Sequence, residues 1–217
     1  MLSRAHNFLF IHIPKTAGNS VQRALLAFSE DEIVLRAAHQ DGVERFELRS
    51  PTLKIHKHSS LADYRAQLDA RQFKGLFKFH GMRNPWDRCV SFFFSPHRGP
   101  VEWSPDAFET FIDTAVIPSH VFLQKGPNDP NLFGNADAVL RHEHLAEDFE
   151  QVCARLGLGP LVLPRVNVST HGASTHGVPE RGDYRSYYRN DQVIARVAEK
   201  FAPEIRRFGY AFDPQAV

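Results

Sequence analysis

The sequence predicts a three-layer α/β domain in which a central parallel sheet is flanked by helices. Three observations lead to this fold class. The 217 residues, 42% of them hydrophobic, are enough to build one compact core. Short, almost wholly apolar runs stand where strands buried on both faces are expected. These runs alternate with segments of helical periodicity, which is the order of elements in a parallel sheet covered by helices. We expect one domain over residues 1–217.

The first strand is predicted over residues 7–13, which are nearly all apolar and are followed by a proline. A helix should follow from about Ser20, because Val21, Leu25 and Phe28 are spaced to share one face. Strand and helix together make the first half of a strand-helix-strand unit.

A second helix is predicted to begin at Ser60, because Asp63 follows three residues later at the spacing of a capping box. Leu61, Tyr64 and Leu68 would form the buried face of this helix.

The second strand is predicted within residues 75–85, where alternating apolar residues end at an Arg-Asn-Pro corner. The stretch DRCVSFFF is apolar enough for a buried helix, and Ser104 should cap a further helix over SPDAFETFIDTAV. The segment ADAVLRHEHLAEDFEQVCARLGLG predicts a short strand and a helix that stops at Gly157. Residues 159–183 predict a long surface loop, and a last helix is expected over about 191–207.

Composition limits the classes of function. With 26 Lys+Arg against 25 Asp+Glu, the formal net charge is +1, so any anion site must be local. Two cysteines are too few for a disulfide framework, which favours a reducing compartment. No signal-peptide core is present, and no run approaches the ~18 apolar residues of a membrane span. We expect a soluble cytoplasmic protein without membrane insertion and without a nucleic-acid partner.

The turn after the first strand, PKTAGNS, predicts an anion-binding cradle. In a parallel sheet, ligands bind beyond the carboxyl ends of the strands, where the next helix offers free N–H groups. Gly18 lets the backbone approach a ligand closely, Lys15 adds a positive charge, and Thr16, Asn19 and Ser20 add hydrogen-bond donors. The pattern differs from the nucleotide-binding motif G-x-x-x-x-G-K-[ST], because the lysine enters the turn and no glycine precedes it.

The turn after the second strand, RNPWDRCVS, adds a second cation. Ser91 follows Arg83 by eight residues, about two turns into the next helix, so a guanidinium and a hydroxyl could hold one phosphate together. Alternatively, Arg83 could pair with Asp87, and Ser91 could be a small residue at a helix contact. Many nucleotide triphosphatases have a metal-binding aspartate at this strand end, so the arginine suggests an anion bound without Mg²⁺.

Together, FIHIPKTAGNS and RNPWDRCVS resemble the 5′-phosphosulfate loop and the 3′-phosphate motif of sulfotransferases that use 3′-phosphoadenosine 5′-phosphosulfate (PAPS). The chain is most similar to the carbohydrate branch, which includes glycosaminoglycan 2-O-sulfotransferases and their bacterial relatives. The stretches HKHSSLADY, FKFHGMRNPWDR, LRHEHLAEDF, LPRVNVS and FGYAF also follow in the family's order. The resemblance implies a P-loop-like fold, PAPS as co-substrate without a metal, and transfer of a sulfonate group to an acceptor hydroxyl of a sugar or glycan.

The resemblance also implies roles for single residues. Lys15 would contact the transferring sulfonate and the bridging oxygen, and Arg83 and Ser91 would hold the 3′-phosphate. His58 would be the general base, with His56 as its neighbour. The 5′-phosphate loop would consist of Lys15, Thr16, Ala17, Gly18, Asn19 and Ser20. The loop after residue 168 would offer Ser169, Thr170 and Arg181 to the nucleotide.

Two rival functions fit parts of the pattern. A kinase-like nucleotide-dependent enzyme could use the same cradle, although the displaced lysine and the missing metal carboxylate argue against it. A non-catalytic module could keep the cradle and bind a nucleotide or an anionic glycan without transfer. His12, which precedes the cradle, is interpreted as structural support for it.

Overall fold

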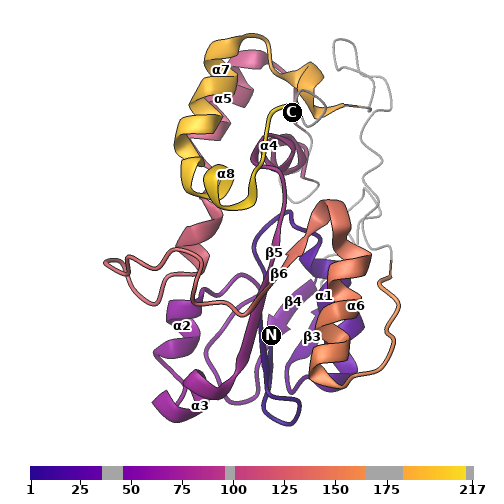
Figure 1. The fold of residues 1–217 in the computed structure, drawn as a ribbon. Helices are drawn as coiled ribbons and strands as arrows, with labels where there is room; N and C mark the ends of the chain where they lie inside the picture. The colour runs from indigo at the N-terminus through magenta and orange to yellow at the C-terminus, as the bar shows by residue number, and fades with distance from the viewer. Residues whose placement is uncertain (36–45, 96–100, 165–182, 214–217) are drawn as a thin grey trace. The chain divides into compact units, whose positions relative to one another are not determined.

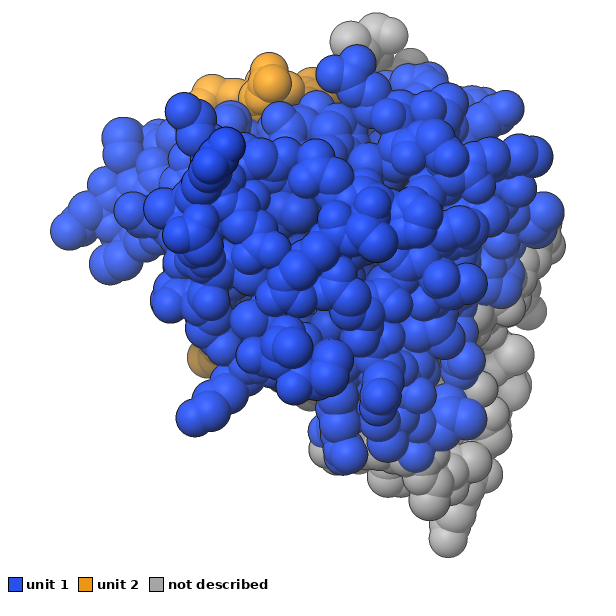
Figure 2. Space-filling view, turned by 90° about the horizontal axis from the view of Figure 1, so that it is seen from below, with its two compact units in different colours: residues 1–82, 119–167 blue, residues 83–118, 168–217 orange. Residues whose placement is uncertain are grey.

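The computed structural model describes residues 1–35, 46–95, 101–164 and 183–213. The chain divides into two compact units, coloured blue and orange in Figure 2. Unit 1 comprises residues 1–82 and 119–167, and unit 2 comprises residues 83–118 and 168–217. That the chain forms one domain stays a prediction.

Unit 1 is built on a four-stranded sheet in the order β1-β2-β5-β6 (Figure 1). The strands are β1 (Leu2–Ser3), β2 (Phe8–Ile11), β5 (Phe77–Met82) and β6 (Ala138–Arg141). β2, β5 and β6 run parallel, and β1 pairs antiparallel with β2 at one edge. Ile11 lies opposite His80, and Met82 lies opposite Arg141, so the parallel strands end at a common edge.

Helices cover both faces of this sheet (Figure 1). They are α1 (Gly18–Leu25) and α6 (Leu145–Leu156) on one face, and α2 (Leu61–Arg65) and α3 (Ala70–Gly75) on the other. Because side chains alternate along a strand, Phe8 and Phe10 pack among residues of α1 and α6, whereas Leu9 and Ile11 pack among residues of α2 and α3. A mostly parallel sheet flanked by helices confirms the predicted fold class.

The helices of unit 1 begin and end where local chemistry favours it. Ser60 and Asp63 form the predicted capping box of α2. The helix ends at Arg65, so Leu68 lies beyond it, and Asp69 caps the unpredicted helix α3 by accepting from two main-chain amides. Gly157 ends α6 in the left-handed conformation, as predicted.

A second, two-stranded antiparallel sheet pairs β3 (Glu32–Leu35) with β4 (Phe46–Arg49). Neither strand has a pattern in the sequence that predicts it. In β4 the burial alternates, with Phe46 and Leu48 buried, so the strand covers the edge of the core with one face only.

Unit 2 is helical, with α4 (Pro85–Phe93), α5 (Pro105–Thr114), α7 (Asp191–Lys200) and α8 (Ala202–Phe208) around an aromatic core. Ser104 caps α5 as predicted, by accepting from the amide of Ala107. The prediction of one helix over 191–207 was wrong, because α7 stops before Phe201. Pro203 lacks the N–H that would continue the helix, and its ring would clash with the preceding turn. No helix among the described residues has the length and apolarity of a membrane span.

Candidate active site at the carboxyl edge of the sheet

The candidate site begins where β2 ends, in the loop that leads into α1. Lys15 and Ala17 both have left-handed backbones, with φ of 67° and 64°. This conformation costs a residue other than glycine about 1–2 kcal/mol, and such residues collect at functional sites. Ala17 is the N-cap of α1 and has no side-chain oxygen to accept from the first turn. The helix start therefore presents main-chain N–H groups to an anion.

Two glycines let this loop lie close to the sheet. A Cβ on Gly18 would lie 2.0 to 2.5 Å from three ring atoms of His12, and a Cβ on Gly81 in β5 would lie 2.3 Å from Oγ1 of Thr16. Thr16 is fully buried, and its hydroxyl donates to the carbonyl of Ile13 at 2.9 Å. The Thr16 side chain therefore supports the loop, and its main-chain amide is the group that it can offer to a ligand.

The remaining loop residues differ in exposure. Lys15, Ala17 and Asn19 are partly exposed, whereas Gly18 and Ser20 are buried at the start of α1. The residues predicted for the 5′-phosphate loop thus lie in the turn that follows β2 and in the first turn of α1.

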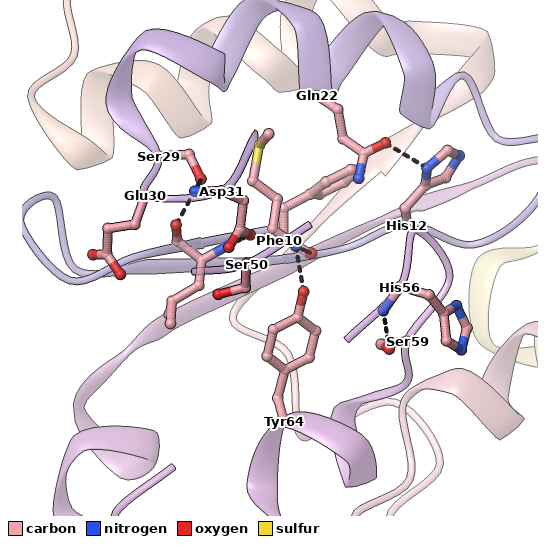
Figure 3. Close-up of polar contacts among 12 residues, drawn as sticks. Phe10, His12, Gln22, Ser29, Glu30, Asp31, Ser50, His56, Ser59 and Tyr64 are labelled. Atoms are coloured by element: carbon pink, nitrogen blue, oxygen red, sulfur yellow. Dashed lines mark hydrogen bonds and ion pairs between the residues drawn. The ribbon is translucent and has the colours of Figure 1, made fainter. Parts of the chain in front are cut away.

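His12 lies directly after β2 and is buried beside the loop. Its Nδ1 donates to Oε1 of Gln22 in α1 at 2.8 Å (Figure 3). The pKa of His12 is held well below the usual value of histidine, chiefly by burial and further by the nearby His58 and Lys57. The ring is therefore neutral at neutral pH, with its proton on Nδ1.

Gln22 was not identified from the sequence, although a signal for it exists. Gly18, Val21, Gln22 and Leu25 recur at i, i+3, i+4 and i+7, so the glutamine falls within the buried stripe of α1. A polar residue in such a stripe needs a buried partner, and this partner is His12.

His58 is anchored next to His12. Its Nδ1 lies 2.9 Å from the main-chain carbonyl oxygen of His12. Because a carbonyl only accepts, Nδ1 carries the proton and the lone pair of the ring is on Nε2. The rings of His12 and His58 meet edge to face, with centroids 4.5 Å apart.

His56 is exposed and shapes the turn that carries His58. Its Nδ1 accepts from the main-chain amide of His58 at 3.1 Å. Its own amide donates to Oγ of Ser59 at 3.0 Å (Figure 3). These two bonds hold the turn between residues 56 and 59.

Arg83 and Ser91 belong to unit 2. Arg83 follows the last residue of β5, and its Nε and Nη2 donate to the two carboxylate oxygens of Asp87 at 2.7 and 2.8 Å. The alternative pairing considered for Arg83 is therefore present. A guanidinium has five N–H groups, so this pair is compatible with a further anion. Ser91 lies on α4 and is partly exposed.

The other predicted nucleotide contacts, Ser169, Thr170 and Arg181, lie outside the described residues.

A sequence model described as "Sulfotransferase family" matches residues 1–211, which is most of the chain. Searches of curated proteins and of solved structures found no match.

Proposed function

We propose that this chain, which belongs to the sulfotransferase family, transfers a sulfonate group to a hydroxyl of a sugar or glycan. In this reaction His58 acts as the general base. Membership of the family makes the chain a transferase and implies PAPS as the sulfonate donor, with some molecule as acceptor. The carbohydrate acceptor is proposed from the His-Lys-His segment at residues 56–58, which resembles the 2-O-sulfotransferase branch.

The loop between β2 and α1 fits the phosphosulfate end of PAPS. It combines the uncapped amides of α1 with a lysine, and two glycines keep the loop compact. When bound, PAPS supplies the sulfonate group and a phosphate as leaving group. Lys15 would stabilise the negative charge that grows on this phosphate, through a charge-assisted hydrogen bond worth about 1.5–3 kcal/mol.

The role of His58 is carried by one observation, the hydrogen bond from its Nδ1 to the carbonyl of His12. This bond leaves the lone pair on Nε2 and holds the ring beside the residue that packs on Gly18. In the proposed reaction, Nε2 of His58 takes the proton of the acceptor hydroxyl while the hydroxyl oxygen forms a bond to sulfur. The bond from sulfur to the leaving phosphate oxygen breaks in the same step. Such base catalysis typically contributes ~10²–10⁴ in rate.

Arg83 and Ser91 are proposed to bind the 3′-phosphate. The bidentate pair with Asp87 would hold the guanidinium in one orientation, which reduces the entropy lost when a phosphate binds.

The test is an assay with labelled PAPS and a panel of glycans. Lys15→Ala and His58→Ala should each lower kcat by about 10² or more. Arg83→Ala should chiefly raise the KM for PAPS. His6→Ala serves as the matched control, because His6 lies before β2 at the opposite end of the strand, and it should transfer at the wild-type rate.

Two outcomes would contradict the proposal. Undiminished transfer in His58→Ala would remove this residue from the role of base. A larger thermal stabilisation by ATP with Mg²⁺ than by adenosine 3′,5′-bisphosphate would favour the kinase-like alternative.

A further inference from the structure

We propose that Gln22 is a positioning residue for sulfonate transfer. Gln22 orients the buried ring of His12, and the ring of the base His58 packs against this ring. The inference rests on the proposed function, because it takes His58 as the base. It assigns a role to a residue of α1 outside the loop that is expected to bind PAPS.

The contacts form a short chain from Gln22 to the base. Gln22 Oε1 accepts from His12 Nδ1 at 2.8 Å, and the His12 ring meets the His58 ring at 4.5 Å. The carbonyl of the same His12 accepts from His58 Nδ1 at 2.9 Å. His58 therefore depends on His12 twice, once through the main chain and once through the ring.

The His12 ring is confined on its other side by Gly18. No Cβ would fit between them, because it would lie 2.0 Å from Cδ2 and 2.3 Å from Nε2 of the ring. A His12 ring that tilted away from its place would therefore press on either Gly18 or His58. The torsion that turns an imidazole is broad and roughly two-fold, so sterics alone do not select one orientation. The bond to Gln22 selects it.

Stability alone does not account for a glutamine at this place. The Gln22 side chain is fully buried, and in the described part of the chain its Nε2 has no hydrogen-bond partner. A buried donor without a partner costs stability; an apolar side chain of similar length would remove this donor but would leave the buried Nδ1 of His12 without its acceptor, so the exchange should be close to neutral in stability. What the glutamine provides is the bond to His12, shown as a dashed line in Figure 3.

The test separates orientation from stability with two substitutions of Gln22. Gln22→Met keeps the length of the side chain and removes the bond to His12, so we expect kcat to fall at least tenfold. The KM for PAPS should change less than threefold, and the midpoint of urea unfolding should change little, because one buried donor without a partner replaces another. Gln22→Glu keeps an acceptor oxygen opposite Nδ1 but also raises the pKa of His12, so it should recover most of kcat at alkaline pH, where the His12 ring is neutral. Gln151→Met, at an exposed position of α6, is the control and should behave as wild type.

A second readout does not depend on activity. Nitrogen NMR of the histidine rings should show His58 protonated on Nδ1 in the wild type and a mixture of tautomers in Gln22→Met.

Three results would overturn the inference. One is wild-type kcat in Gln22→Met with an unchanged His58 tautomer. Another is a fall in kcat that Gln22→Glu does not reverse even at alkaline pH and that follows a matching loss of stability, because a merely structural role predicts this pattern. The third is full activity in His58→Ala, which removes the base itself. If His58→Ala is inactive and Gln22→Met is fully active, the inference fails alone and the proposed function stands.

Discussion

Replacing Gly18 by alanine tests how tightly the His12 ring lies against the start of α1. The new Cβ would lie 2.0 Å from Cδ2, 2.3 Å from Nε2 and 2.5 Å from Cγ of His12. The ring has little room to retreat, because it is 4% exposed and is bonded to Gln22. Overpacking a close-packed site typically costs about 1–3 kcal/mol, and three contacts this short place Gly18→Ala near 3 kcal/mol.

Urea and thermal unfolding measure this cost. In a protein of this size, 1 kcal/mol corresponds to a change in Tm of about 2–4 °C, so a fall of about 6–12 °C is expected. Stabilisation by adenosine 3′,5′-bisphosphate should weaken in the same variant, because the loop can no longer close on the ring. Gly126→Ala is the control, since a Cβ there meets nothing within 4 Å and its φ is not positive. It should change stability by no more than about 0.5 kcal/mol.

A double-mutant cycle assigns the cost to the His12 ring. In a His12→Ala background the ring is gone, so Gly18→Ala should become milder by about 1–3 kcal/mol. An equal cost of Gly18→Ala in both backgrounds would refute the reasoning, because some other contact would then limit the size of residue 18.

Two further predictions concern unit 1. Burial, opposed by a weaker hydrogen bond to the Gly81 carbonyl, lowers the pKa of His80 to about 4. Between pH 6.5 and 4 only the unfolded chain therefore takes up this proton, and stability should fall by about 3 kcal/mol for this residue as the pH drops through this window. Urea titrations at several pH values should show that His80→Gln removes this part of the loss. Ala17→Gly should raise the free energy of unfolding by up to about 1 kcal/mol, because relief of the left-handed backbone strain exceeds the entropy that glycine adds to the unfolded chain. A lower stability would mean that the methyl group of Ala17 makes contacts that outweigh the strain.

The parts of the fold that the sequence predicts are those with strong local signals. The apolar runs of β2 and β5, the capping box at Ser60 and the glycine stop at Gly157 each depend on a few neighbouring residues. The pair β3 and β4 was missed because strand pairing between distant segments leaves little trace in either one. The break before Phe201 was missed because helical periodicity outweighed Pro203, although proline in a helix interior should have decided the question.

In the candidate site, too, features that depend on neighbouring residues can be predicted, whereas contacts between distant segments cannot. The loop around Gly18 is contiguous in sequence, so its residues can be recognised together. The contact between His58 and His12 joins residues 46 positions apart, and no pattern in either segment encodes it. Gln22 could have been found, since it interrupts an apolar stripe, but its partner depends on how β2 and α1 pack.

The neutrality of His12 matters for the proposed base. An imidazolium at the centroid distance of 4.5 Å would repel a second positive charge on His58 by about 4 kcal/mol at an effective dielectric constant of 20. Proton uptake by His58, on which base catalysis depends, would then be disfavoured by a factor of about 10² to 10³. Burial of His12 prevents this, because desolvation is the largest cause of its lowered pKa. A carboxylate in place of Gln22 would favour the charged form of His12, whereas an amide orients the ring without charging it, which gives a physical reason for glutamine at this position.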